Sequence, residues 1–506
     1  VAPGNGIIVP DHDINNGSEY ISISGTSAST AQISGIAALL IEAFPNLTAA
    51  QVADLLFTTA TDLGAPGTDV IYGRGLVNVA QAFTAQGQLS VAGTGFSAAA
   101  NIGTVQNVSQ QNLIFSGGAF GADISFSTAT ENIMVLDKYD RSFSLDLSKG
   151  IYTQQPTINI EGFMNNSLSS HYQNVRVNDK TTIKLAWRHD NRFADIDKRY
   201  FANHLGRERK AENLRMSLSY MINDQQIARM SSGMSIAEMT EDYRPDDYIA
   251  QGKHGFASLL SSSSSRAISY KSLVGKKSSF EMTFATGKYD FAKELFANKI
   301  TVKNTVLLNR LTHHVNANMT LSLDVGLLEE KGSVLGAISR GALEIGSGAS
   351  TAFIGAKINF NLSSDTQFFA NASYGITDVK QSSQSILGNL STLKSYSYLM
   401  GIKSNDLLFN NDQISFSFSQ PLRLSSGDAI ISNAVSRNYN TNQFIMSYDR
   451  FSLKPGGTER DFEMSYSLAN IYGAKIRFNL LYQLNPGHVK SINSATSVLV
   501  RLGSAF

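Results

Sequence analysis

The fold of most of this chain is decided by a stretch near its end, KIRFNLLYQL at residues 475–484. Apolar side chains occupy every second position from Ile476 to Leu484, and most of the residues between them are polar. Successive side chains of a β-strand point to opposite faces, so this alternation predicts a strand with one apolar and one polar face.

The same alternation recurs through residues 175–506, where we expect about 12 strands separated by polar turns such as 261–265 and 410–413. Transmembrane β-barrels are built from such segments, although large soluble β-sandwiches and soluble barrels also alternate. The polar face is rich in Ser, Asn, Lys and Arg, which suits a wet lumen and favours the membrane barrel. The further candidate strands are 183–187, 214–220, 280–284, 354–362, 396–402, 414–418, 444–448, 462–468 and 498–506.

Composition excludes several classes of function. The 506 residues predict two or more domains, and a net charge of +1 gives no excess of cations for nucleic acid. Without cysteine, a disulfide framework, a thiolate metal site or a cysteine nucleophile is impossible. The longest mainly apolar run, Ile33 to Phe44, is shorter than the ~20 residues of a membrane helix, so any membrane contact would use strands.

The first 84 residues have a different, α/β pattern. Residues 28–44 are apolar at most positions, which predicts a buried helix that ends before Pro45. A second helix is expected to start near Leu47, where Thr48 and Gln51 have the spacing of a capping box.

A serine stands where the first of these helices begins. The sequence GTSASTAQISG at residues 25–35 follows a β-like run that ends at Ser24. Ser27 would therefore lie at a helix N-terminus, where free N–H groups and the helix dipole favour a developing oxyanion. Serine is also common as a simple N-cap, so the position alone does not identify a nucleophile.

The flanking residues resemble subtilisin-like serine proteases. Ala2-Pro3-Gly4 is similar to the turn that precedes the catalytic serine, Gly25-Thr26-Ser27 matches the serine motif, and Gly35 matches the glycine eight residues on. Residues 47–60 and 72–78 resemble the closing helix and final turn of that fold. The resemblance implies that Ser27 is the nucleophile, that its backbone N–H lines the oxyanion hole beside Thr26 and Gly25, and that the substrates are polypeptides.

Other parts of that family's site are not matched. This chain has Ala31 and Gln32 where the family usually has Pro and His. The family's Asp, His and oxyanion-hole amide would all precede Val1, so we expect upstream residues in the complete protein and an inactive fragment. The cluster Asp11 to Asp13 is not a substitute, because we expect it in a solvated turn away from the serine.

No cofactor is expected from this sequence. A weak calcium site at Asp11 and Asp13 is the alternative to a solvated turn, and any further calcium would belong to the upstream part of the protease domain. The remaining histidines lack ligand-like spacing, and we interpret them as surface or lumen residues: His171, His189, His204, His254, His313, His314 and His488.

The rest of the chain resembles the translocator half of bacterial subtilisin-like autotransporters. We accordingly divide the chain into a protease remnant (1–84), a connector with short strands (85–174) and a β-barrel (175–506). The resemblance implies a barrel in the Gram-negative outer membrane, recognised by the barrel-assembly machinery, with the protease exported. The segments that carry it are 117–121, 136–141, 326–336, 419–423, 485–488 and the terminal Phe506.

Two functions follow as hypotheses. In the first, the chain is the C-terminal part of a membrane-anchored serine endopeptidase that acts through an acyl-enzyme on Ser27. In the alternative, the barrel is the working part, as a translocator or pore, and the protease remnant is degenerate. A soluble adhesin-like β-protein is a third possibility.

Overall fold

The computed structural model describes residues 1–13, 17–94, 96–99, 113–115, 117–122, 127–152, 170–188, 214–234, 236, 239, 255–260, 265–291, 300–383, 385–471 and 474–504. The chain forms two compact units. The first contains residues 1–111, 130–149 and 432–448, and the second contains the remaining segments 112–129, 150–431 and 449–506. The three-part division expected from the sequence remains a prediction.

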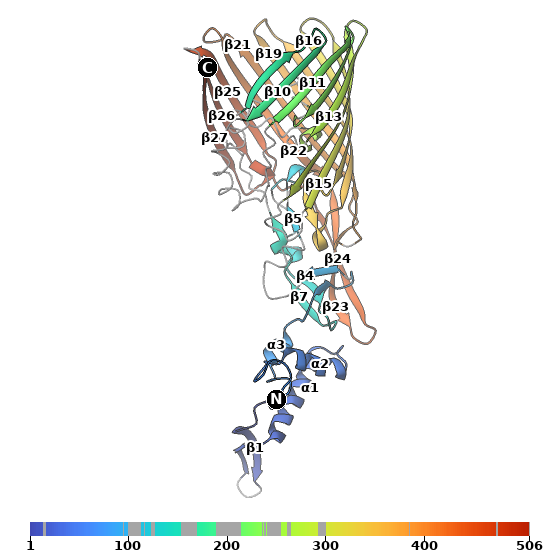
Figure 1. The fold of residues 1–506 in the computed structure, drawn as a ribbon, viewed down its shortest axis with the longest axis vertical. Helices are drawn as coiled ribbons and strands as arrows, with labels where there is room; N and C mark the ends of the chain where they lie inside the picture. The colour runs from blue at the N-terminus through green and yellow to red at the C-terminus, as the bar shows by residue number, and fades with distance from the viewer. Residues whose placement is uncertain are drawn as a thin grey trace. The chain divides into compact units, whose positions relative to one another are not determined.

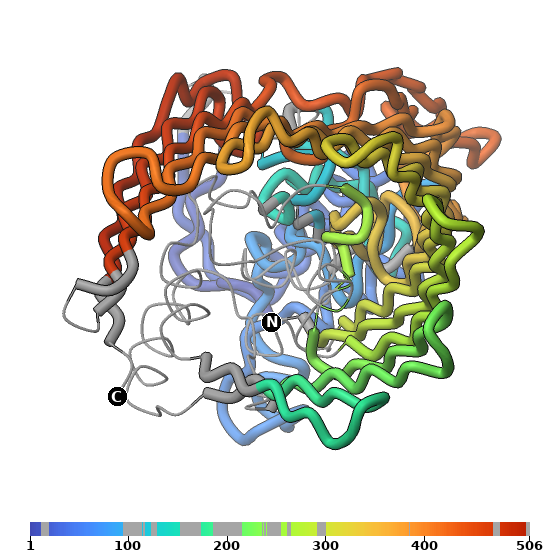
Figure 2. The backbone as a smooth tube through the Cα atoms, turned by 90° about the horizontal axis from the view of Figure 1, so that it is seen from above, coloured from blue at the N-terminus to red at the C-terminus, as the bar shows by residue number. Residues whose placement is uncertain are grey.

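The second unit is dominated by one antiparallel sheet of 15 strands within the described residues, three more than expected. Seen from above, the sheet curls around a central space (Figure 2). From one edge to the other its strands are β27 (Ser494–Ser504), β26 (Ala474–Leu484), β25 (Arg460–Ile471), β22 (Asp412–Ser426), β21 (Leu393–Asn405), β19 (Thr366–Lys380), β18 (Gly348–Asn361), β16 (Met319–Lys331), β15 (Ile300–His314), β14 (Ser278–Phe291), β13 (Arg266–Val274), β12 (Gln226–Ser232), β11 (Leu214–Asn223), β10 (Thr181–Arg188) and β9 (Ser170–Arg176).

The two faces of this sheet have the chemistry that the sequence predicted. On β16, Leu323 and Val325 are 50% and 48% exposed, whereas Asp324 between them is only 7% exposed. Strand β27 likewise exposes Val498 and Val500 and buries Leu499 and Arg501. Apolar side chains thus cover the outside and most polar ones point to the inside, as in barrels that face lipid.

Turns at one end of the sheet are short, and connections at the other end are long. Seven antiparallel pairs are joined by two to six residues, among them 275–277 and 362–365. The alternate connections are longer, and several of them contain further described elements (Figure 1). These elements are β17 (Ile338–Arg340), η6 (Gly341–Leu343), β20 (Leu387–Gly388), β23 (Asp428–Asn438), β24 (Gln443–Ser452), η5 (Phe256–Leu259) and η7 (Pro486–His488).

One expected barrel strand belongs elsewhere. Residues 444–448 lie in β24, which forms a separate three-stranded sheet with β20 and β23 and does not join the barrel wall. Alternation predicts a strand but not its partner, and this strand is part of the connection between β22 and β25.

The connector meets the barrel at the end with the long connections. Strand β5 (Leu113–Phe115) pairs with β17 and with β8 (Ile151–Tyr152), and it is followed by η1 (Gly118–Phe120). Gly118, with φ +55°, packs so closely that a Cβ would lie 2.0 Å from the carbonyl oxygen of Leu335. Ala119 donates from its backbone to that carbonyl, and Ala122 donates to Gly487 O at 2.7 Å.

The first unit contains three helices, α1 (Thr26–Ala43), α2 (Ala49–Thr59) and α3 (Val79–Phe83), and a hairpin of β1 (Ile7–Asp13) and β2 (Gly17–Ile23). Thr48 and Gln51 form the predicted capping box of α2, which begins two residues later than expected. A four-stranded sheet follows, from β4 (Phe96–Ala99), β3 (Leu89–Val91), β6 (Ile133–Leu136) and β7 (Ser142–Leu145). No helix among the described residues is both long and apolar enough to cross a membrane.

Candidate active site

Ser27 is the second residue of α1 and is exposed to solvent. Gly25 precedes the helix with φ 154° and ψ 160°, a backbone conformation that only glycine adopts readily. This residue makes the sharp turn from strand to helix that the sequence predicted. No side chain caps α1, and of the N–H groups in its first turn that of Ala28 donates to Gly25 O at 3.2 Å, so the Ser27 N–H is not used by a side-chain cap and can face an anionic group.

The Ala-Pro-Gly turn packs directly against the serine turn. Gly25 donates its N–H to Gly4 O at 2.7 Å, and Ser29 Oγ donates to Pro3 O at 3.1 Å. A Cβ on Gly4 would lie 2.4 Å from Ser29 Oγ and 3.1 Å from Gly25 O, so a larger residue at this position would displace the Ser29 side chain. The two sequence elements that carried the protease resemblance are therefore neighbours in space.

Helix α1 is less buried than its sequence predicted. Only Ala28 and Leu40 are buried, whereas Leu39 and Ile41 are 53% and 47% exposed. The covered side packs on α2 and on residues of the β6–β7 hairpin, which leaves the opposite apolar side of the helix uncovered in this structure. The expectation of a helix buried all round was therefore wrong for this chain.

The cluster Asp11 to Asp13 lies in strand β1 and not in a turn. Asp11 pairs with Glu19, six residues before Gly25 on the partner strand. At about 3.3 Å per residue, that register places the cluster roughly 20 Å from the serine turn. This distance supports the rejection of the Asp11 to Asp13 cluster as a substitute general base. Among the described residues, no group of three or more His, Asp or Glu side chains could hold a metal ion.

The histidines differ in their surroundings. His313 and His314 are exposed, as expected, and bond to Ser278 and Thr320. His488 is buried, which corrects the surface or lumen interpretation: its Nδ1 accepts from Glu459 N at 2.9 Å. It serves to fix the β26–β27 connection. His189, His204 and His254 lie outside the described residues, as does Phe506, and so do the side-chain surroundings of His171.

The inner face of the barrel holds ion pairs between different strands, of which some are adjacent in the sheet and one pair is separated by an intervening strand. Arg229 and Glu281 bond at 2.8 Å, and Arg310 bonds Asp324 at 2.6 Å. Lys357 approaches the second oxygen of Asp324 at 3.5 Å. Strand alternation suggested a polar inner face, but it did not predict these pairs, because they join strands whose register one sequence does not fix.

Residues 1–75 match the model of the subtilase family. The match ends close to the last element of the resemblance found in the sequence, and it covers both the Ala-Pro-Gly turn and the serine turn.

Similar proteins agree over the same short segment. The chain is 52% identical over 58 residues to serotype-specific antigen 1 of Mannheimia haemolytica and 43% identical over 63 residues to an extracellular serine protease of Serratia marcescens. It is 43% identical over 60 residues to subtilisin DY of Bacillus licheniformis. Each alignment uses 12% of this chain, and covers 6%, 6% and 21% of the respective relative, so the chain matches only a small part of their length.

Similar solved structures are outer-membrane β-barrels. The alignment with a porin covers 66% of this chain and 90% of the porin chain, with a TM-score of 0.33 and 10% identity. OprB of Pseudomonas putida covers 64% and 82%, with a TM-score of 0.35 and 10% identity. OmpT of Vibrio cholerae covers 56% and 78%, with a TM-score of 0.29 and 9% identity.

Proposed function

We propose that this chain is the C-terminal part of a subtilisin-like serine endopeptidase that a β-barrel anchors in the Gram-negative outer membrane. The observation that carries the proposal is the serine turn: Ser27 lies in the first turn of an uncapped helix, and its neighbours Gly25 and Ser29 bond to the Ala-Pro-Gly turn inside the segment that matches the subtilase model. In the complete protein, Ser27 Oγ attacks the carbonyl carbon of a peptide bond while a general base takes the Ser27 proton. The base returns that proton to the nitrogen, the C–N bond breaks, the amine leaves, and water then hydrolyses the acyl-enzyme.

The residues of the turn have separate roles in this proposal. The Ser27 N–H donates to the oxyanion of the tetrahedral intermediate, while Gly25 and Thr26 set the angle between strand and helix. A general base must accept the Ser27 proton, and among the described residues no side chain bonds to Ser27 Oγ. We therefore expect hydrolysis only when the base and its orienting carboxylate are supplied, and not from these 506 residues alone.

The barrel is proposed to span the membrane. An apolar outside, a polar inside, short turns at one end and long connections at the other are the features of outer-membrane barrels. Because the long connections of such barrels face the cell exterior, and β5 pairs within one of them, we place the peptidase segment outside the cell. Assembly machinery and outer-membrane lipid are the corresponding partners, and polypeptides are the substrates.

Labelling with a serine-directed fluorophosphonate tests the enzymatic proposal. In the full-length protein we expect modification of Ser27, its loss in Ser27→Ala, and normal labelling in Ser34→Ala, which alters an exposed serine of the same helix. Absence of labelling in folded full-length protein would contradict the proposal.

That negative result would favour the second candidate, a translocator or pore with a degenerate protease remnant. The charged, ion-paired inner face of the barrel is the observation that supports it. Detergent extraction separates both candidates from a soluble adhesin-like protein: a membrane barrel is released by detergent and not by salt or carbonate.

A further inference from the structure

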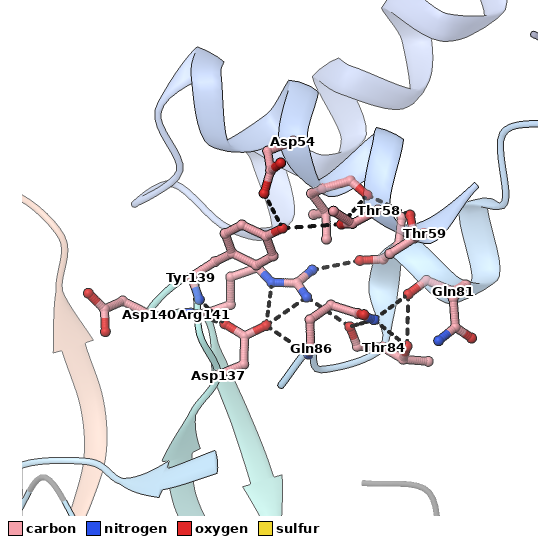
Figure 3. Close-up of polar contacts among 12 residues, drawn as sticks. Asp54, Thr58, Thr59, Gln81, Thr84, Gln86, Asp137, Tyr139, Asp140 and Arg141 are labelled. Carbon is pink, nitrogen blue, oxygen red and sulfur yellow. Dashed lines mark hydrogen bonds and ion pairs between the residues drawn. The ribbon is translucent and has the colours of Figure 1, made fainter. Parts of the chain in front are cut away.

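A short turn between β6 and β7 completes the core of the helical segment. Tyr139 is 6% exposed and belongs to one buried cluster with residues of α1, α2 and α3. Its hydroxyl donates to Asp54 Oδ2 at 2.7 Å and lies 3.2 Å from Thr58 Oγ1, as Figure 3 shows. The turn thus supplies an aromatic ring and a polar anchor to helices that precede it by about eighty residues.

Arg141 makes the second contact from the same turn. Its side chain is fully buried, pairs with Asp137 at 2.7 Å, and donates to the carbonyl oxygens of Ala82 at 2.6 Å and Thr84 at 2.8 Å (Figure 3). The guanidinium also lies 4.7 Å from the centre of the Phe44 ring. A charge held by two carbonyls at the end of α3 is a specific contact, since a fully buried arginine is stable only when its donors are satisfied.

The β6–β7 hairpin also contacts a segment that lies between two barrel strands in the sequence. Residues 432–448, which we call the arm, are parts of β23 and β24 between the barrel strands β22 and β25. Asn433 accepts from Met134 N at 3.3 Å and donates to Asn132 O at 3.1 Å. Arg437 donates to Asp140 O at 2.5 Å, so the arm fixes the backbone of the turn.

We propose that the turn 137–141, held by the arm, is a docking surface for the helical segment (residues 26–83), and that these contacts are sufficient to retain this segment on the barrel when its covalent connection through residues 100–112 is cut. The partner is the helical segment of the same chain, recognised through the Tyr139 ring and hydroxyl and through Arg141. Such a cut would place the helices α1 to α3 and the turn 137–141 on two different fragments. It would break none of the contacts described above. The proposal does not depend on whether Ser27 is catalytic.

The experiment uses the full chain with a site-specific protease sequence inserted between residues 105 and 106. The barrel is purified in detergent, its folding is checked by heat-modifiable migration, and the chain is cut. We expect the N-terminal fragment to remain with the barrel fragment through size-exclusion chromatography. Its prompt loss from the otherwise unaltered chain would overturn the proposal.

Variants of the turn identify the contacts. Tyr139→Ala removes the ring from the core, and we expect release of the fragment to be faster by a hundredfold or more, on the order of the cost of a buried aromatic truncation. Tyr139→Phe keeps the ring and loses only the hydroxyl, so release should be faster by about tenfold or less. If Tyr139→Ala fails to fold, the release rate of Tyr139→Phe still tests the contact.

Asp140→Asn is the matched control. Its side chain points away from the helices in Figure 3, only its backbone oxygen contacts the arm, and asparagine tolerates its φ of 58°. We expect retention equal to that of the unaltered turn. Equal release from Tyr139→Ala and Asp140→Asn, or equal retention by both, would overturn the assignment of the docking surface.

Discussion

Replacing Arg141 by methionine should destabilise the first unit strongly. The substitution keeps the length and apolar stem of the side chain but leaves Asp137, fully buried in the ion pair, without its cation. It also removes the donors that reach Ala82 O and Thr84 O. Removal of one partner of a buried pair costs about 3–5 kcal/mol, which corresponds to roughly two to three and a half orders of magnitude in an opening equilibrium.

Hydrogen exchange of the buried α2 amides measures this effect. Val52 and Leu55 lie in the cluster that Tyr139 completes, so their exchange should accelerate by at least a hundredfold in Arg141→Met. The double variant with Asp137→Asn should recover part of the protection, because asparagine removes the unpaired charge and still accepts the N–H of residue 141. Exchange within threefold of the unaltered protein would refute the reasoning.

An exposed ion pair of the same type provides the control. Arg176 and Asp179 bond at 3.0 Å, with their side chains 70% and 98% exposed. Such pairs contribute little, because water solvates both charges in either state. Arg176→Met should therefore leave the exchange of α2 unchanged, and an effect as large as that of Arg141→Met would show that the assay reports charge loss and not burial.

Three further substitutions test other levels of the structure. Val325→Arg, on the outer face of β16, should make the free energy of folding into lipid vesicles less favourable by about 2–4 kcal/mol. Val435→Arg, on the exposed arm, should not change this free energy. Equal folding of the two variants would contradict the lipid-facing assignment of Val325. Thr48→Ala removes the capping box and should cost α2 about 1 kcal/mol, measured by exchange, and no change would contradict the cap. Gly118→Val should disrupt the contact with Leu335 and expose the Ala119 amide to exchange, while Gly388→Ala, which has open space, should not; retained protection would refute the steric argument.

Local pattern predicted the strands well because period-two alternation is a property of a few neighbouring residues. The opening stretch at 475–484 lies in β26, and 214–220 and 462–468 lie in β11 and β25. The same pattern could not give the number of strands or assign 444–448 to the arm, because pairing depends on partners far away in the sequence.

The serine turn could be predicted because its elements are short and close together in the sequence. Ser27 and Gly25 were found from the local strand-to-helix pattern, and the Ala-Pro-Gly turn was found from the family resemblance. The contacts of Gly25 and Ser29 with that turn support the arrangement but not the chemistry. The roles of Asn433 and Arg437 could not be foreseen, since their partners lie about 300 residues away. Arg141 was noted only within a resemblance, and nothing local signalled its complete burial.

Labelling of intact cells tests the central claim most directly. Cells that produce the full-length protein are treated with a membrane-impermeant fluorophosphonate, and the labelled residue is identified by mass spectrometry in unaltered, Ser27→Ala and Ser34→Ala proteins. We expect a label on Ser27 in unaltered and Ser34→Ala cells and none in Ser27→Ala cells. A folded outer-membrane barrel whose Ser27 is never labelled, on intact or opened cells, would contradict it.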